Sequence, residues 1–93
     1  MLTTSEIQKL LKEARQKVSV GSFWRHKKGG VYRVLGHGFD TELARIDVHY
    51  HRVGGPDYNP REEYGIIFDR PLFMWTDDRF TRMSPKEVFE NGG

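Results

Sequence analysis

The sequence Ser-Phe-Trp-Arg-His-Lys-Lys-Gly-Gly-Val-Tyr-Arg-Val-Leu-Gly, residues 22–36, places two short β-type runs on either side of a turn. The runs are 22–27 and 31–35, and Lys28-Gly29-Gly30 joins them. Glycine accepts the positive φ that tight turns need, so the pattern predicts a β-hairpin. We expect the rest of the fold to build outward from this hairpin.

Three further β-type runs follow the hairpin, at 45–52, 64–68 and 80–83. The clearest is 45–52, where apolar side chains alternate with polar ones, the apolar set being Ile46, Val48 and Tyr50. A period of two sends one face of the strand into a core.

Two interruptions are predicted between these runs. Gly36 and Gly38 break the strand pattern, so we expect a loop or a short irregular connection at 39–43. The stretch 53–63 combines turn-forming residues with charged ones, so we expect an exposed, mobile loop there.

An amphipathic helix is predicted at 4–17. Thr3 and Glu6 stand at capping-box spacing at its start. Its apolar residues follow the spacing of a single stripe, which consists of Ile7, Leu10, Leu11, Ala14 and Val18. We expect this stripe to cover the open end of a barrel or a sheet.

A short second helix is predicted at 85–90. Ser84 is a typical cap, Pro85 suits the first helical position, and Glu87 completes a capping box.

The chain of 93 residues leaves room for a single domain, 1–93. Five short strands separated by turn residues predict a mainly β fold, a small antiparallel barrel at about 21–83. No signal peptide or bilayer-spanning apolar run is visible, so we expect no membrane partner. The absence of cysteine excludes disulfides and thiolate metal sites, and it suits a reducing cytoplasm.

Charge is distributed unevenly along the chain. Residues 9–33 contain eight basic residues and one acidic residue, whereas the chain from Val34 onward contains seven basic and eleven acidic residues. The basic part suits an anionic partner such as nucleic acid, a nucleotide or an acidic protein. It is also consistent with a solvated face or with docking against the acidic remainder, because the net charge of +2 is small for a nucleic-acid-binding domain.

Residues 22–36 resemble the opening block of the bacterial and phage domain-of-unknown-function family 1653, which runs aromatic-Arg-His-x-Lys-Gly-Gly-x-Tyr. The block 70–75, Arg-Pro-Leu-Phe-Met-Trp, is similar to a second block of that family, and 79–80, Arg-Phe, to a third. The matches span about residues 21–80 in the same order. The resemblance implies an SH3-type β-barrel, and it implies no settled activity.

Patterns for catalysis and metal binding are weak. His49 and His51, outside the family's pattern, project from one face of a strand and could ligate a metal together with His26 or His37. Two histidines on a solvent face are more often plain polar residues. No nucleophile elbow, phosphate-binding glycine loop or carboxylate pair with a raised pKa is recognisable. We therefore expect no enzyme, no cofactor and no metal site.

The strongest candidate site is a mixture of aromatic and basic residues. Small barrels leave a groove in which a ring can stack and a guanidinium can hold a base, a phosphate or a peptide. We expect such a groove to be formed by Trp24, Arg25, His26, Lys28, Tyr32, Tyr50, Arg70 and Trp75, with Phe73 in the same cluster.

The alternative is an architectural role for part of this set. Tyr32, Tyr50 and Phe73 would then fill the core, and Arg70 would tie a loop by bonding backbone carbonyls. Trp24 and Trp75 are expected at the surface, because tryptophan is hard to hide in a domain of this size.

These observations predict a non-enzymatic binding module for nucleic acid or a nucleotide-like anionic ligand. The rival is a protein-interaction domain, a homodimer or a phage-encoded modulator of a host protein, which would use the N-terminal helix and the 53–63 loop. SH3-like barrels serve both purposes, so fold alone does not decide between them.

Overall fold

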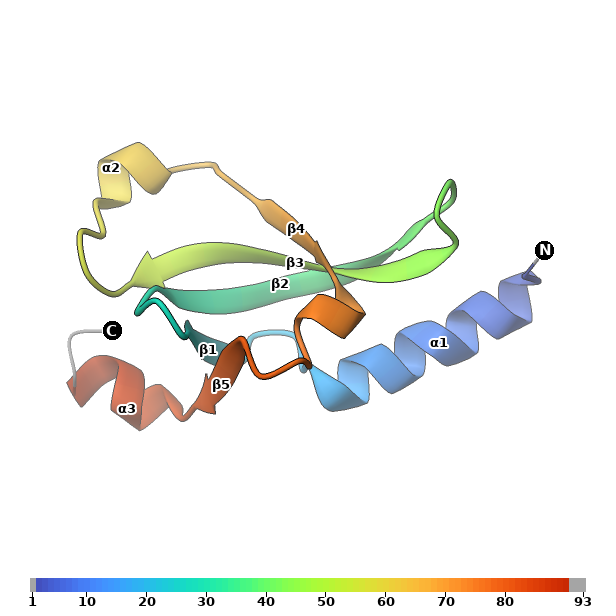
Figure 1. Cartoon of the computed structure of the whole chain (residues 1–93), viewed down its shortest axis with the longest axis horizontal. Coiled ribbons are helices and arrows are strands. Elements are labelled where there is room, and N and C mark those ends of the chain that lie inside the picture. The colour runs from blue at the N-terminus through green and yellow to red at the C-terminus, as the bar shows by residue number, and fades with distance from the viewer. Residues whose placement is uncertain (1, 91–93) are drawn as a thin grey trace.

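Five strands form one antiparallel sheet, with helices at both ends of the chain (Figure 1). The computed structural model describes residues 2–90, and the strand order across the sheet is β4-β3-β2-β1-β5. The elements in chain order are α1 (Thr4–Lys17), β1 (Phe23–His26), β2 (Val31–Asp40), β3 (Arg45–Gly54), α2 (Pro60–Glu63), β4 (Phe68–Pro71), the 3₁₀ turn η1 (Leu72–Met74), β5 (Phe80–Met83) and α3 (Pro85–Glu90). The mainly β class, the number of antiparallel strands and the two terminal helices are confirmed. The strand predicted at 64–68 is wrong in position, because only Phe68 of that range belongs to β4, which pairs with β3 over 68–71. Positions 1 and 91–93 of the predicted domain lie outside the described residues.

Helix α1 begins where the capping pattern predicts. Thr3 Oγ1 accepts the Glu6 backbone N–H at 3.1 Å, and Glu6 Oε1 accepts the Thr3 backbone N–H at 3.0 Å. The helix contacts β2 and β3, and Ala14 and the following Val18 are fully buried. The other members of the apolar stripe are half-buried: Ile7, Leu10 and Leu11.

Strands β2 and β3 form one long hairpin, so the predicted interruption begins too early. The strand continues through Gly36 and Gly38 to Asp40. A register shift just before Gly36 accommodates the first glycine. At Gly38 a Cβ would lie 2.9 Å from the His49 ring. The second glycine therefore makes room for a cross-strand neighbour rather than ending the strand.

The sheet curls, so that its two edges approach each other. Tyr50 on β3 and Phe80 on β5 lie three strands apart in the sheet order. Strands are spaced by about 4.8 Å, so these rings would be about 14 Å apart on a flat sheet. Their centroids are 6.1 Å apart. The edge strands β4 and β5 do not pair with each other within residues 2–90, so the sheet is curled but open.

The two faces of the sheet carry separate apolar clusters. On the concave face the buried residues are Val18, Val34, Val48, Tyr50, Trp75 and Phe80, with Trp24, Tyr32 and Leu72 packed against them. The opposite face carries Val31, Met83 and Val88, with Phe23 and Val53. Helix α3 contributes Val88 to this second cluster. The predicted capping box is present at the start of α3, because the Ser84 N–H donates to Glu87 Oε1 at 3.0 Å and the Glu87 N–H donates to Ser84 Oγ at 3.1 Å.

Trp75 is the largest fully buried side chain, so its predicted surface position is wrong. The turn η1 reverses the chain after β4 and carries the Trp75 indole inward, where it is 1% exposed. The indole stacks on Phe80 with centroids 3.9 Å apart and planes 7° apart. The same turn leaves Phe73 64% exposed, so Phe73 does not fill the core.

The 53–63 stretch is more ordered than the predicted loop. Strand β3 extends to Gly54, and α2 follows with Asn59 as its cap, whose Oδ1 accepts the Arg61 N–H at 3.0 Å. The Arg52 guanidinium donates to the carbonyl oxygens of Gly54 and Pro56 and so holds the chain between them.

Two glycine turns pack together beside that chain segment. Gly55 has φ +95°, and a Cβ there would lie 2.5 Å from the Gly29 carbonyl oxygen and 2.9 Å from the Gly30 Cα. Only glycine fits this backbone contact. The contact fixes the turn after β3 against the turn between β1 and β2.

Substitution of the two aromatic residues near η1 tests this description of the core. Trp75→Ala should lower the free energy of unfolding by about 3–5 kcal/mol, because it leaves a cavity beneath Phe80. Phe73→Ala, in the same turn, should change it by less than about 0.5 kcal/mol. Urea unfolding followed by circular dichroism measures both. Equal losses would show that the indole does not fill the core.

Candidate functional site

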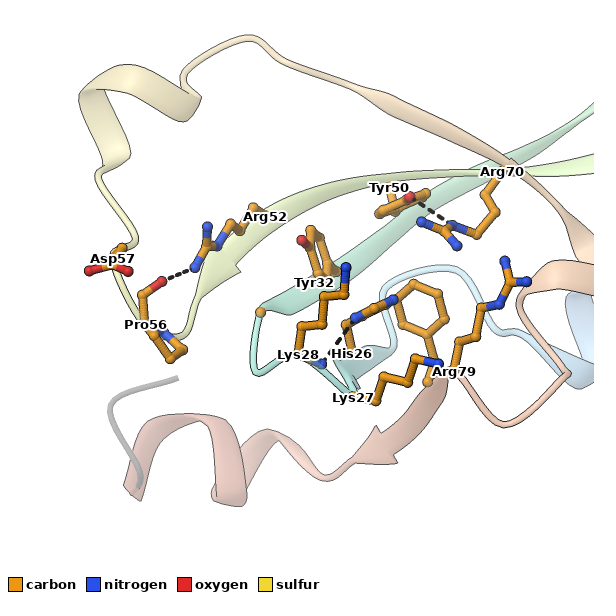
Figure 2. A pocket seen from close by; sticks show the side chains of 12 residues that line it. His26, Lys27, Lys28, Tyr32, Tyr50, Arg52, Pro56, Asp57, Arg70 and Arg79 are labelled. Carbon is orange, nitrogen blue, oxygen red and sulfur yellow. Dashed lines mark hydrogen bonds between the residues drawn. The ribbon is translucent and has the colours of Figure 1, made fainter.

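A pocket of about 660 Å³ opens at the end of the sheet where the two glycine turns meet (Figure 2). Its walls come from the end of β1, the β1–β2 turn, β2, β3, the turn after β3, β4 and the start of β5. We call it the cationic pocket, because five of its lining residues are basic and one is acidic. The lining residues are His26, Lys27, Lys28, Gly30, Tyr32, Tyr50, Arg52, Pro56, Asp57, Arg70, Arg79 and Phe80.

The β1–β2 turn places two lysines at the pocket. Gly29 N–H donates to the His26 carbonyl at 2.7 Å, and His26 N–H donates to the Gly30 carbonyl at 2.8 Å, which closes the predicted hairpin. The Lys27 N–H donates to the Arg79 carbonyl at 2.9 Å and ties the turn to the residue before β5. The turn is thus fixed on both sides.

His26 is held as a neutral ring by its surroundings. Its Nδ1 accepts the Lys28 backbone N–H at 3.1 Å, so the neutral ring carries its proton on Nε2. Burial lowers the pKa of His26 below its usual 6.5, and the positive charges of Arg70, Lys28, Lys27 and Arg79 lower that pKa further. Four cations that line the same pocket therefore act on one imidazole.

Arg70 spans the gap between the two edges of the sheet. It lies on β4, its Nε donates to the Tyr50 hydroxyl at 3.1 Å, and its guanidinium lies 5.3 Å from the centre of the Phe80 ring on β5. Phe80 is thus stacked on Trp75 and also contacts Arg70. Within residues 2–90 the two terminal nitrogens of Arg70 have no hydrogen-bond partner and no carboxylate.

The apolar wall of the pocket is a set of rings in edge contact. Tyr32 contacts Tyr50 and Phe80 with centroids 5.3 and 6.1 Å apart, and His26 contacts Phe80 at 5.0 Å. Burial raises the pKa of Tyr32 above 10.0, so its hydroxyl keeps its proton at neutral pH. Gly30 allows Tyr32 to lie against the turn, because a Cβ there would be 2.8 Å from the Tyr32 hydroxyl oxygen.

The remaining two arginines of the pocket are already engaged. Arg52 bonds the backbone carbonyls described above and lies 3.8 Å from Glu63 Oε1. Arg79 Nε lies 3.1 Å from Asp77 Oδ2. The predicted loop-tying arginine exists, but it is Arg52 and not Arg70. Lys27 and Lys28 form no ion pair with any described carboxylate.

The structure brings together five of the eight predicted site residues, which are His26, Lys28, Tyr32, Tyr50 and Arg70. Trp24 lies outside the lining, where its Nε1 donates to Ser22 Oγ at 2.7 Å and its ring meets Trp75 at 5.8 Å. Arg25 is exposed on the opposite face of β1, and Trp75 is in the core.

Sequence reasoning missed four major lining residues, which are Lys27, Arg52, Arg79 and Phe80. Arg79 and Phe80 form the third family-like block, so a signal for them was present in the sequence. Arg52 continues the alternation of Val48 and Tyr50 in the predicted strand 45–52, so it lies on the pocket face of β3 and its signal was overlooked.

The predicted histidine pair lies on the other face of the sheet from the pocket. His37 pairs with Val48 in the register, so His49 and His51 point away from both His37 and His26. His49 Nε2 lies 3.7 Å from Asp69, whose pKa is raised by burial and by the Asp47 carboxylate. Residues 2–90 contain no group of three or more acidic, histidine or cysteine side chains arranged to hold a metal.

An NMR titration of the histidines tests the electrostatics of the pocket. His26 should titrate below 6.5, and inorganic phosphate should raise its pKa by offsetting the surrounding cations. As the pH falls below about 6.5 the unfolded chain takes up this proton first, so His26 should make the fold less stable in acid. His37, whose pKa burial also lowers, should not respond to phosphate. The description fails if both histidines shift alike or if His26 titrates above 6.5.

None of the helices within the described part of the chain is long and apolar enough to cross a lipid bilayer. No protein-family model, curated protein or solved structure matches this chain, so the geometry of the pocket is the basis for its functional interpretation.

Proposed function

We propose that the protein is a non-enzymatic binding module whose cationic pocket holds a nucleic acid or a nucleotide-like anionic ligand. The observation that carries the proposal is Arg70. Two contacts hold its guanidinium in place, and its terminal nitrogens remain unpaired among residues 2–90. A positioned guanidinium with free donors suits phosphate, which it can bind through two parallel hydrogen bonds.

The charge around Arg70 favours an anion. Lys27 and Lys28 add two cations that no described carboxylate neutralises, whereas Asp57 is the only acidic residue of the lining. The rest of the basic segment does not contribute to this site, because its other residues lie on α1 or on the opposite face of the sheet. Arg33, for example, lies over the Phe23 ring at 5.4 Å.

The chemistry of the walls favours a ligand with an aromatic part. Tyr32 and His26 are half-buried at the pocket, and both rings can contact a nucleobase. Stacking of a base on such a ring is typically worth about 1–3 kcal/mol and tolerates any base. A sulfate-like or carboxylate ligand without a ring would leave this wall unused.

We also propose that the curled sheet is an SH3-like barrel left open between β4 and β5. In such a barrel β1 lies between β2 and β5, as it does here, and a 3₁₀ turn joins β4 to β5, as η1 does. The register shift in β2 supports the same interpretation, because a bulge lets a strand bend. The resemblance to family 1653 points in the same direction.

A protein-interaction role remains the second candidate, and one observation favours it. The segment that leads into edge strand β4 exposes apolar side chains, with Tyr64 88% and Ile67 64% exposed. Binding of this kind would not depend on the cationic pocket, so the salt experiment below separates the two proposals.

The salt dependence of oligonucleotide binding tests the proposed function. A single-stranded oligothymidylate with a 5′-phosphate and a 3′-fluorophore should bind at low salt. The Lys27→Ala/Lys28→Ala variant should bind it more weakly, with a log-log salt slope shallower by about 1.4, because each phosphate contact on a single strand contributes about 0.7. Fluorescence anisotropy measures both quantities.

The matched control removes two lysines of α1, Lys9 and Lys12, which lie outside the pocket. Lys9→Ala/Lys12→Ala should leave the affinity and the slope close to those of the wild type. If both double variants weaken binding equally, the binding depends on the net charge of the protein and not on the cationic pocket. No binding at low salt would refute the proposal and favour the protein-interaction candidate.

A further inference from the structure

We propose that the cationic pocket recognises a terminal phosphate on an unpaired nucleotide, at a strand end or on a free nucleotide, and not the phosphodiesters inside a strand or a duplex. This inference rests on the proposed function and specifies its ligand. It is carried by the convergence of the cations, the free donors of Arg70 and the position of the Tyr32 ring.

The cations gather at one pocket instead of following a single element. Lys27 and Lys28 come from the β1–β2 turn, Arg70 comes from β4 and Arg79 from the residue before β5, yet all four line the same pocket as His26. Figure 2 shows these side chains at the pocket. A surface that tracks a strand would instead place its charges along the strand, because the backbone carries one phosphate for every nucleotide.

A concentrated positive charge matches a concentrated negative one. A phosphodiester carries a single charge, whereas a phosphomonoester carries about −1.5 to −2 at pH 7 and offers three strong acceptor oxygens. The pocket offers two uncompensated lysines and Arg70 as charges. Its charge therefore suits the terminal group better than the internal one.

The donors of the pocket also outnumber the oxygens of a phosphodiester. The two terminal nitrogens of Arg70 can bind two oxygens of one phosphate, because its Nε is already bonded to Tyr50. His26 adds a third donor, Nε2–H, because its Nδ1 accepts the Lys28 N–H. A terminal phosphate has a third non-bridging oxygen for this donor, and a phosphodiester does not.

The aromatic wall requires that the attached base be unpaired. Tyr32 lines the pocket beside the β1–β2 turn that carries Lys28, so a phosphate held by the cations lies within reach of the same ring for its own base. In a duplex the faces of the bases are stacked on one another and are not available to a side chain. A blunt duplex would therefore offer the phosphate without the base.

The experiment compares ligands that differ only at their ends. Fluorescence anisotropy would be measured with a single-stranded oligothymidylate of ten nucleotides that carries an internal fluorophore. Three forms of this strand are compared, which bear a 5′-phosphate, a 3′-phosphate or only hydroxyl ends. The fourth ligand is a blunt duplex with 5′-phosphates. We expect at least one phosphorylated single strand to bind tenfold or more tightly than the hydroxyl form, and the duplex to bind no more tightly than the hydroxyl form. The 5′ and 3′ arms identify which end is preferred.

Variants assign the preference to the pocket. Arg70→Lys and His26→Gln should each reduce the preference for the phosphorylated end at least threefold, while Lys12→Ala on α1 should leave it unchanged. Arg70 also bridges the two edges of the sheet, so Arg70→Lys could unfold the protein. His26 makes no such bridge, so the phosphate preference of His26→Gln still tests the pocket in that case.

Three results would overturn the inference. If all single strands bind within twofold of one another, the proposed function stands but the terminal phosphate is not recognised. If the phosphorylated duplex binds as tightly as the phosphorylated single strand, the unpaired base is not required. If no oligonucleotide binds at low salt, the proposed function fails together with this inference.

Discussion

The bridge from Tyr50 through Arg70 to Phe80 is the interaction on which most of this structure depends. It connects β3 and β4 to β5 across the open side of the sheet, where no backbone hydrogen bonds join the described strands. The Phe80 ring that meets Arg70 is the same ring that stacks on Trp75 in the core. Phe80 thus contacts the Arg70 guanidinium at the pocket and the Trp75 indole in the core, and both contacts stabilise the curled sheet. All three residues of the bridge line the cationic pocket.

The second constraint is the contact between the two glycine turns. Gly55 lies against Gly29 and Gly30, which leaves no space for a Cβ. Arg52 holds the chain after β3 in position by bonding two carbonyl oxygens. Both turns reach the same end of the sheet, so the lysines of the first turn and Pro56 and Asp57 of the second line a single opening. The backbone contact between the two glycine turns therefore determines where the residues of both turns lie at the pocket.

Most of the secondary structure could be predicted because it rests on local signals. The capping boxes at Thr3 and Ser84, the alternation around Val48 and the glycine turn at Gly29 each act within a few residues. The extension of β2 could not be predicted, because Gly38 is explained only by the His49 ring on the next strand. The burial of Trp75 was missed for a similar reason. A 3₁₀ turn sets its direction, and neither residue size nor spacing reveals that turn. Five site residues were predicted from the mixture of aromatic and basic residues. Arg52 and Arg79 also carried a sequence signal, but only the fold shows that they line the same pocket.

A double-mutant cycle on the free energy of unfolding tests the central bridge most directly. Tyr50→Phe removes only the hydroxyl that holds Arg70, Arg70→Met removes the guanidinium at similar length, and the double variant removes both. The bridge predicts that the two effects are strongly non-additive, with a coupling free energy of about 0.5 kcal/mol or more, because each variant breaks the same hydrogen bond. Effects that add to within about 0.3 kcal/mol would contradict it, and would mean that the Tyr50 hydroxyl does not hold Arg70 in the bridge.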